Sequence, residues 1–356
     1  MTELKLGLGL ELYRGAELRV PVERVQLCER LGYHVVWTAE AYGSDAMTPL
    51  AYLAGLTDRI KLGTAIVQLA ARTPAATAMQ AMTIDAMAGG DRMIVGLGVS
   101  GPQIVEGWYG RPWGKPNAML RDYVEIMRKV FRREEPLSHE GSQISLPYTG
   151  PGSIGQGKAL KSIMHGNPNI EIWIASGGPR NTALCAEVAD GWLPMGYGPD
   201  GAEVFDEHLD KGFAKRDARL VAREDFEVFA NLTVEVTDDV SAAIAERKPL
   251  RAMYVGGMGS ESHNYHRDAM ARAGFGEQAD RIQELFLAGH KQAAIDAMPD
   301  EYIEQGALFG SVRRIRERFD QAIPAGATGL TIRTSQPEAF ELMADLAGTR
   351  DTNPKS

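Results

Sequence analysis

The sequence predicts a (β/α)8 barrel, and three observations lead to this prediction. Short apolar runs alternate with amphipathic helical patterns along most of the 356 residues, which indicates parallel strands joined by crossover helices. The strand-like runs number eight, a count that fits a closed barrel better than an open sheet. Several runs end in glycine or in small hydroxylic residues, as strands do where a barrel carries its chemistry.

The alternation can be followed from the first residues to the last. Strands are expected at residues 4–10, 34–38, 60–67, 93–99, 171–175, 191–195, 226–236 and 329–333. Helices are expected between them, at residues 18–31, 49–57, 74–88, 119–131, 179–189 and 338–346.

The unit from residue 60 to residue 99 carries the clearest signals. Residues 60–67 are rich in Ile, Val and Leu, and Thr73-Pro74 supplies an N-cap with proline at the first helical position. Methionines then recur at helical spacing until Gly89-Gly90 stops the helix. The next strand runs straight into Ser100-Gly101-Pro102-Gln103, so this unit is a strand, a helix and a strand.

Two segments do not belong to the minimal alternation. Residues 132–169 contain a glycine-rich stretch and are expected to form a long loop with a hairpin, either a lid over a substrate cleft or plain decoration. Residues 242–311 are expected to form a mostly helical insertion between the seventh and eighth strands. We therefore expect one barrel domain over residues 1–356 with these two insertions.

Composition narrows the possible functions. The formal net charge is -9, which argues against nucleic-acid binding and against a polybasic membrane contact. The two cysteines, Cys28 and Cys185, both fall in apolar helical patterns, so we expect buried thiols, no disulfide and a reducing compartment. The first residues lack a basic stretch followed by an apolar one, and no run of 18 apolar residues occurs, so we expect a soluble, cytoplasmic protein.

The candidate site follows from the barrel itself. Functional groups gather where barrel strands end, because the loops there converge on one cavity and helix N-termini present free N–H groups. Five such loops define the proposed site: Glu40-Ala41-Tyr42, Thr64-Ala65-Ile66, Ser100 to Gln103 with Glu106 and Trp108, Ser176-Gly177-Gly178, and Met195-Gly196-Tyr197.

The loop Ser176-Gly177-Gly178-Pro179-Arg180 joins a strand to a helix. Glycine lets the backbone approach a ligand closely, and a helix N-terminus favours a phosphate, although such turns are also common without any ligand. No metal site is expected, because His263 and His266 have no accompanying ligand set. No G-x-G-x-x-G opens a helix with an acidic residue at the required distance, which argues against a nicotinamide site.

Four segments, in this order, resemble one known family. They are IKLGTAI, the helix start ARTP, GLGVSGPQIVEGW and ASGGPRNTALCAEVADGWLP. The chain resembles the bacterial-luciferase-like superfamily of flavin and deazaflavin oxidoreductases, and within it the F420-dependent branch. The resemblance covers about residues 4–236 and returns at residues 326–333.

This resemblance implies a barrel enzyme that binds coenzyme F420 and moves a hydride between the cofactor C5 and a small organic substrate. It implies that the cofactor phosphate lies at Ser176 to Gly178 with Arg180 beside it. It also implies a bulge after Thr64, with a non-prolyl cis peptide between Ala65 and Ile66 that backs the cofactor ring. A homodimer or higher oligomer is expected on the same ground.

The resemblance also suggests roles for the remaining loops. Ser100 and Gln103 are expected to hydrogen-bond the cofactor, and Tyr42, Trp108 and Tyr197 to line the substrate.

Glu40 and Glu106 are the candidate proton donors or acceptors. Glu40 could instead be a helix-capping or salt-bridging residue.

The chain departs from the family pattern at one point. Several similar deazaflavin enzymes carry an Asp-His pair where this sequence reads Glu40-Ala41, which puts an imidazole acid or base in doubt. This departure keeps open the alternative of a catalytically silent F420-binding protein. An FMN-dependent monooxygenase on the same barrel is a second alternative.

Overall fold

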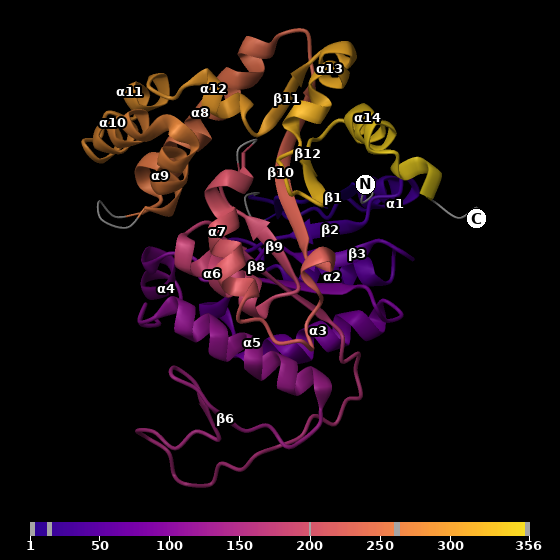
Figure 1. Ribbon diagram of the computed structural model, residues 1–356, viewed down its shortest axis with the longest axis vertical. Coiled ribbons are helices and arrows are strands. Elements are labelled where there is room, and N and C mark those ends of the chain that lie inside the picture. Colours follow the sequence, from indigo (N-terminus) through magenta and orange to yellow (C-terminus); the bar gives the residue numbers. More distant parts are fainter. Residues whose placement is uncertain (1–3, 13–15, 199–200, 260–263, 353–356) are drawn as a thin grey trace.

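The computed structural model describes residues 4–12, 16–198, 201–259 and 264–352 (Figure 1). Eight parallel strands close into a barrel, because the first strand pairs with the last and the sixth pairs with the seventh. In order around the barrel they are β1 (Lys5–Gly9), β2 (Val35–Thr38), β3 (Lys61–Thr64), β5 (Met93–Gly98), β8 (Glu171–Ser176), β9 (Gly191–Pro194), β10 (Glu227–Val236) and β12 (Gly329–Arg333).

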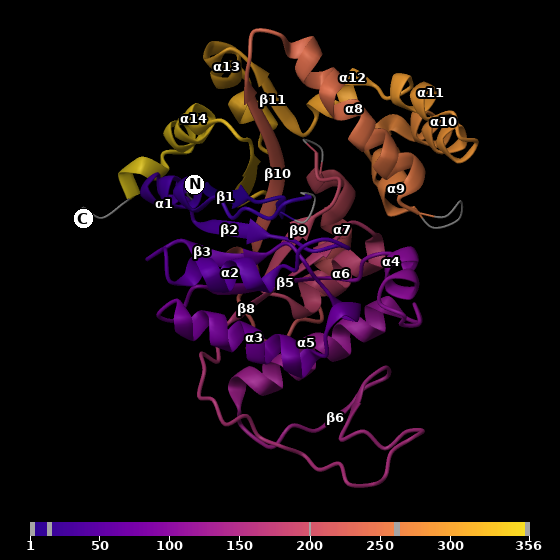
Figure 2. The ribbon, with the colours of Figure 1, turned by 180° about the vertical axis from the view of Figure 1, so that it is seen from behind.

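Helices cover the outside of this barrel (Figure 2). They are α1 (Val22–Arg30), α2 (Met47–Ala54), α3 (Pro74–Met87), α5 (Pro116–Arg132), α6 (Pro179–Val188), α7 (Gly201–Phe213), α13 (Val312–Ala322) and α14 (Pro337–Ala347). All eight predicted strands are confirmed, as is the (β/α)8 fold. None of the described helices has the length and hydropathy that crossing a lipid bilayer requires.

The predicted strand at residues 60–67 is interrupted in the structure. β3 ends at Thr64, and the short β4 (Val67–Gln68) resumes the pairing with β5. Three residues of one chain segment, Thr64 to Ile66, stand opposite two of the other, which is the count of a β-bulge. The apolar run predicts a strand throughout, because a bulge leaves no mark on hydrophobic periodicity.

Three aromatic rings fill the inside of the barrel. Trp37, Trp173 and Phe229 lie with ring centroids 5.2 to 5.9 Å apart, and all three side chains are buried. Glycines make room for them: a Cβ at Gly63 would lie 2.2 Å from the Trp37 ring, and one at Gly191 would lie 2.4 Å from the Trp173 ring. This aromatic cluster is the floor on which the site is built.

The insertion predicted at residues 242–311 is mostly helical, as expected. It contains α8 (Val240–Gly257), α9 (Tyr265–Met270), α10 (Gly276–Leu287), α11 (Lys291–Asp296), α12 (Asp300–Glu304) and β11 (Ala307–Gly310). The buried apolar side chains of these helices form a hydrophobic cluster separate from that of the barrel. β11 adds a further strand that pairs with the second half of β10.

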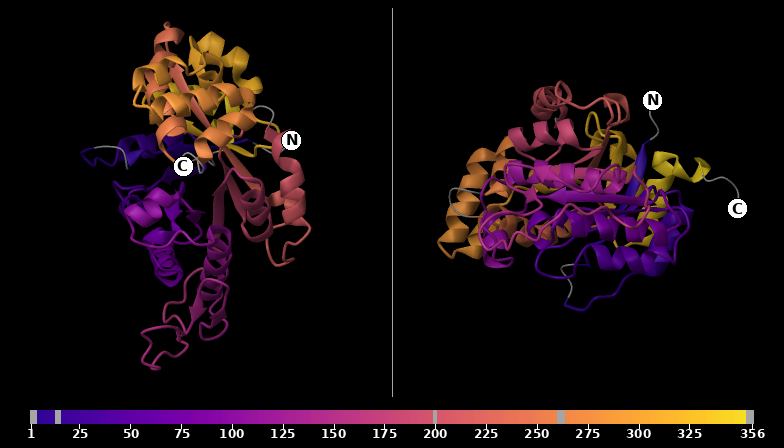
Figure 3. Two further views of the ribbon diagram at one scale, coloured as in Figure 1. Left: turned by 90° about the vertical axis from the view of Figure 1, so that its left-hand side faces the viewer. Right: turned by 90° about the horizontal axis from the view of Figure 1, so that it is seen from below.

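The segment predicted at residues 132–169 contains the expected hairpin, β6 (His139–Glu140) with β7 (Ser145–Leu146). It packs along the outer side of α5, where the Asp122 carboxylate accepts hydrogen bonds from the N–H groups of Gln143 and Ile144. Figures 1 and 3 show it projecting from the body, at the end opposite the helical insertion. Its place outside the helix layer favours decoration over a lid.

Candidate active site

The bulge after β3 contains a cis peptide bond between Ala65 and Ile66, as the resemblance implied. Both residues are partly exposed and pack on the aromatic floor of the barrel. Thr64 is fully buried, and its hydroxyl donates to the carbonyl of Gly96 and accepts from its N–H, both at 2.9 Å. Thr64 therefore anchors the bulge to β5, and Ala65 and Ile66 form its accessible surface.

Glu40 lies two residues after β2 and is almost fully buried, with 3% of its side chain exposed. Both of its carboxylate oxygens bind Arg72, at 2.7 and 2.9 Å. The same oxygens also accept the backbone N–H groups of Gln68 and Ala46, at 2.9 and 3.1 Å. Four hydrogen-bond donors thus surround this carboxylate. These contacts fit the alternative in which Glu40 is a salt-bridging residue.

The Glu40 and Arg72 pair holds the bulge from two sides. The backbone N–H of Glu40 donates to the carbonyl of Ile66, and the Gln68 side-chain amide donates to the carbonyl of Glu40. Burial lowers the pKa of Arg72, but the hydrogen bonds and the charge of Glu40, together with the charge of Asp45, outweigh burial and raise the pKa. The pair thus ties the loop after β2 to the segment that follows the cis peptide.

The turn after β8 leaves an open helix N-terminus. Gly178 is the N-cap of α6, no side chain caps it, and a Cβ built at Gly178 would meet nothing within 4 Å. Arg180 lies in the first turn with an exposed side chain. The first N–H groups of a helix have no partner inside the helix, so this turn offers donors and a cation to an anion.

The other two residues of this turn have structural contacts. Ser176 is buried, and its hydroxyl lies 3.2 Å from that of Thr182. A Cβ at Gly177 would lie 2.9 Å from the carbonyl oxygen of Met195, so this glycine permits close approach of the following strand. Gly178 is therefore the position that faces open space.

The loops after β2 and β5 meet at the mouth of the barrel. The rings of Tyr42 and Trp108 lie 6.4 Å apart, and both are more than half exposed. The Tyr109 hydroxyl donates to the carbonyl of Ala41 at 3.3 Å. Burial, followed by the charge of Glu40, raises the pKa of Tyr109. The structure thus brings the two predicted substrate aromatics together.

The loop after β5 begins with Ser100 in a left-handed conformation, at φ 61°, and continues into α4 (Pro102–Gly107). The Gln103 side-chain amide donates to the carbonyl of Met258 at the end of α8, at 2.8 Å. Gln103 therefore links this loop to the helical insertion. Glu106 is exposed and accepts the backbone N–H of Trp113 at 3.2 Å.

Tyr197 is not brought together with the other predicted residues. Its ring packs against Trp192 and Phe205 in the layer between barrel and helices, and its hydroxyl donates to the carbonyl of Ala325 at 2.6 Å. Burial raises its pKa to about 12. The strand-end rule selects this residue by its position alone, whereas its ring contacts Trp192 and Phe205.

Sequence reasoning missed three residues of the site. Arg72 belongs to the ARTP motif. The buried carboxylate of Glu40 needs a cationic partner, and that need is the signal that could have pointed to Arg72. Glu11 follows β1, Arg333 is the last residue of β12, and the two form an ion pair at 2.9 Å. The strand-end rule would have found both, had it been applied to the first and last strands.

Metal chemistry finds no support in the described part of the chain. Within it, no group of three or more His, Cys, Asp or Glu side chains is arranged to hold a metal ion. His263, one of the two histidines considered from the sequence, lies outside the described residues.

The chain is similar to known proteins over nearly its whole length. The family model for luciferase-like monooxygenases matches residues 6–329. A protein of Mycobacterium tuberculosis described as a "putative coenzyme F420-dependent oxidoreductase" is 44% identical over 344 residues, which cover 96% of this chain and 99% of that protein.

Two solved structures share the fold over nearly their whole length. The coenzyme F420-dependent tetrahydromethanopterin reductase of Methanopyrus kandleri superposes with a TM-score of 0.75 at 22% identity, covering 96% of this chain and 97% of that one. An F420-dependent secondary alcohol dehydrogenase, in complex with an F420-acetone adduct, superposes with a TM-score of 0.71 at 14% identity, covering 98% and 99%.

Proposed function

Because the chain belongs to the luciferase-like monooxygenase family, we propose that it is an F420-dependent oxidoreductase that moves a hydride between the deazaflavin C5 and an organic substrate. The relative that is 44% identical over almost the whole chain supports F420 over FMN. The cis peptide surface and the open N-terminus of α6 support a bound cofactor of this shape.

The residues present fit F420 at two places. The open N-terminus of α6, with Gly178 uncovered and Arg180 beside it, suits the cofactor phosphate. The cis peptide between Ala65 and Ile66 offers a partly exposed, apolar surface against which a flat ring can lie. When bound, F420 supplies a hydride donor or acceptor; the protein supplies position and exclusion of water.

Preorganisation is the main contribution of the chain in this proposal. The Glu40 and Arg72 ion pair fixes the bulge, and the aromatic cluster below it keeps water from the inner side of the ring. A site held in one geometry loses little free energy to reorganisation when the substrate arrives. In this proposal Glu40 is a positioning residue, because all of its carboxylate positions are used within the fold.

Glu106 is then the carboxylate that can serve the substrate. It is exposed at the mouth and accepts one hydrogen bond, from Trp113, among the described residues. Trp108 and Tyr42 lie beside its loop and offer an aromatic surface to an organic substrate. We assign to Glu106 the transfer of a proton that accompanies hydride transfer.

Turnover with a panel of organic substrates tests this function. The absorbance of F420 is followed in the presence of the protein, together with oxygen consumption. A substrate-dependent change of the deazaflavin band without oxygen consumption supports the proposal. Oxygen consumption with reduced FMN supports the monooxygenase alternative. No turnover with any substrate, despite tight F420 binding, supports the silent binding protein.

A further inference from the structure

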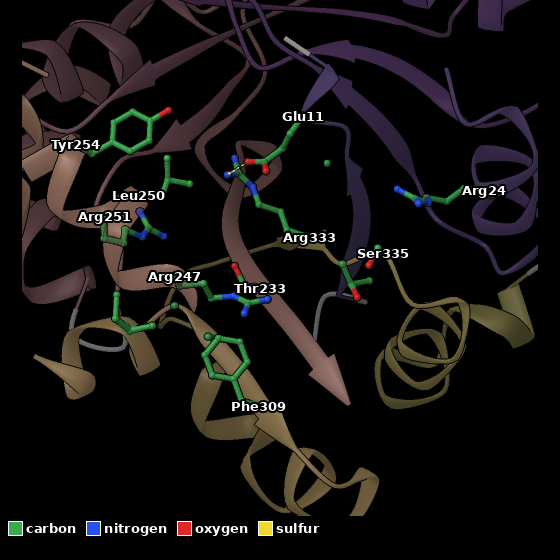
Figure 4. A pocket seen from close by; sticks show the side chains of 15 residues that line it. Glu11, Arg24, Thr233, Arg247, Leu250, Arg251, Tyr254, Phe309, Arg333 and Ser335 are labelled. Carbon is green, nitrogen blue, oxygen red and sulfur yellow. Dashed lines mark hydrogen bonds and ion pairs between the residues drawn. The ribbon is translucent and has the colours of Figure 1, made fainter. Parts of the chain in front are cut away.

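A cavity of about 370 Å³ lies beside the mouth of the barrel, between the strands β1, β10 and β12 and the helix α8 (Figure 4). Four arginines line it: Arg24, Arg247, Arg251 and Arg333. Glu11 is the carboxylate in its lining. Arg247 is already paired with Glu235, so the positive character of the cavity comes mainly from Arg24 and Arg333, in a chain whose formal net charge is -9.

The arginines reach the cavity from separate elements. Figure 4 shows Arg24 pointing inward from α1, with Arg247 and Arg251 on the opposite side, on α8, and Arg333 with Glu11 between them. Three elements, α1, α8 and β12, thus bring positive charges close together. On a solvated surface such charges would lie farther apart. Such convergence costs free energy through like-charge repulsion, which an anion would relieve.

Arg333 carries the clearest sign of a missing partner. Its terminal nitrogen Nη1 binds Glu11 at 2.9 Å, but its buried Nε has no hydrogen-bond partner among the described residues. Gly9 leaves room for the Arg333 side chain, because a Cβ at residue 9 would lie only 3.2 Å from Arg333 Cγ. A buried guanidinium donor without an acceptor costs free energy, so an acceptor supplied by a ligand is favourable here.

Arg247 is held in a fixed position at the wall of the cavity. It donates to Glu235 at 2.5 Å and to the carbonyl of Ala243 at 2.8 Å, and it lies 4.7 Å from the centroid of the Phe309 ring. A guanidinium held this way has its charge balanced by Glu235 and forms a fixed polar wall of the cavity. The cavity is therefore built and partly rigid before any ligand enters.

The position of the cavity relates it to the proposed reaction. Around the barrel, β10 lies four strands from β3 in either direction, so the cavity faces the cis peptide from across the mouth. A flat ring that rested one face on Ala65 and Ile66 would leave its other face open toward β10. A substrate would approach that open face, beside the cavity.

We propose that this cavity binds an anionic group of the substrate, a carboxylate or a phosphate, with Arg333 and Arg24 as its main anchors. The inference rests on the proposed function, which it narrows to an acidic organic substrate. Guanidinium groups bind carboxylate and phosphate through paired, charge-assisted hydrogen bonds. Acidic groups of the cofactor itself share this chemistry, and the experiment separates the two sources.

Calorimetric titration of the protein without F420, at constant ionic strength, tests the site with succinate and with inorganic pyrophosphate as probes. Wild type is expected to bind at least one probe saturably. Arg333→Gln and Arg24→Gln should weaken that binding about tenfold or more, the effect of losing hydrogen bonds to a charged group. Arg313→Gln, exposed on α13 and outside the cavity lining, is the matched control and should bind as wild type does.

Arg333→Gln loses the ion pair with Glu11 and could fail to fold for that reason. In that case Arg24→Gln alone tests the site. Absence of saturable binding in wild type overturns the inference, as does equal weakening by the control. Displacement of the probe by F420 also overturns it, because the cavity would then serve the cofactor. If wild type binds the probe through Arg24 but does not bind F420, the anion site is supported and the proposed function alone fails.

Discussion

The carboxylate of Glu40 and the guanidinium of Arg72 form a two-pronged ion pair, with Nη1 to Oε1 at 2.7 Å and Nη2 to Oε2 at 2.9 Å. Both side chains are buried, at 3% and 14% exposed. The pair joins the end of β2 to the segment that follows the cis peptide. Its disruption should therefore change the stability of the site before it changes any chemical step.

Glu40→Gln should lower the free energy of unfolding by about 2 kcal/mol, because Arg72 loses its hydrogen-bonded counter-ion and keeps only Asp45, at 3.8 Å. F420 affinity should fall as well, since the bulge loosens. Chemical denaturation and a fluorescence titration measure the two effects. Arg72→Met together with Glu40→Gln should cost less than the sum of the single changes. Unchanged stability with a large loss of turnover would instead make Glu40 a proton donor.

Glu106→Gln should leave stability unchanged, because this side chain is exposed, and should slow hydride transfer by about 10²–10⁴-fold, the usual range for a lost general acid or base. Single-turnover kinetics with a substrate from the panel measures the rate. Normal turnover in this variant removes Glu106 from the mechanism.

Gly178→Val should weaken F420 binding about tenfold or more, because a side chain there covers the N–H groups at the start of α6. The thermal midpoint should not move, since a Cβ at this position meets nothing within 4 Å. Gly55→Val, at an equally open position after α2, is the control. Gly177 is a poor choice because its Cβ would press on Met195. Wild-type affinity in folded Gly178→Val would place the phosphate elsewhere.

Stability should fall as the pH drops from about 6.5 to about 4. Burial, and then the charges of Lys5 and Lys61, lower the pKa of His34 to about 4, whereas Glu171 opposes this shift. The unfolded chain therefore binds a proton in this range that the folded chain does not, which destabilises the fold. His34→Gln should flatten the fall in the thermal midpoint, and exposed His290→Gln should not. An equal slope in both variants would rule out His34 as the cause.

The sequence predicts the barrel well because burial on both faces makes each parallel strand a continuous apolar run. All eight runs form strands, and the N-cap predicted at Thr73 accepts the N–H of Ala76. The bulge within the third run could not be read from periodicity, since an extra residue changes hydrogen bonding without changing hydrophobicity. The cis peptide there was implied by the family resemblance alone.

The site was only partly predictable, for a physical reason. Strand-end position identifies which residues can reach the mouth, but the partner of each side chain depends on contacts between distant segments. Glu40 binds Arg72, which lies on another loop, and the ring of Tyr197 packs against Phe205 in the helix layer. The arginines of the cavity come from α1, α8 and β12. Because these elements are far apart in the sequence, no local motif predicts the cavity.

Binding of F420 against binding of FMN tests the central claim most directly. The purified protein, freed of bound cofactor, is titrated with each by fluorescence under the same conditions. We predict a Kd for F420 at least about tenfold below that for FMN, which corresponds to about 1.4 kcal/mol of preference. An FMN affinity equal to or higher than that for F420 would contradict the assignment of this chain as a deazaflavin enzyme.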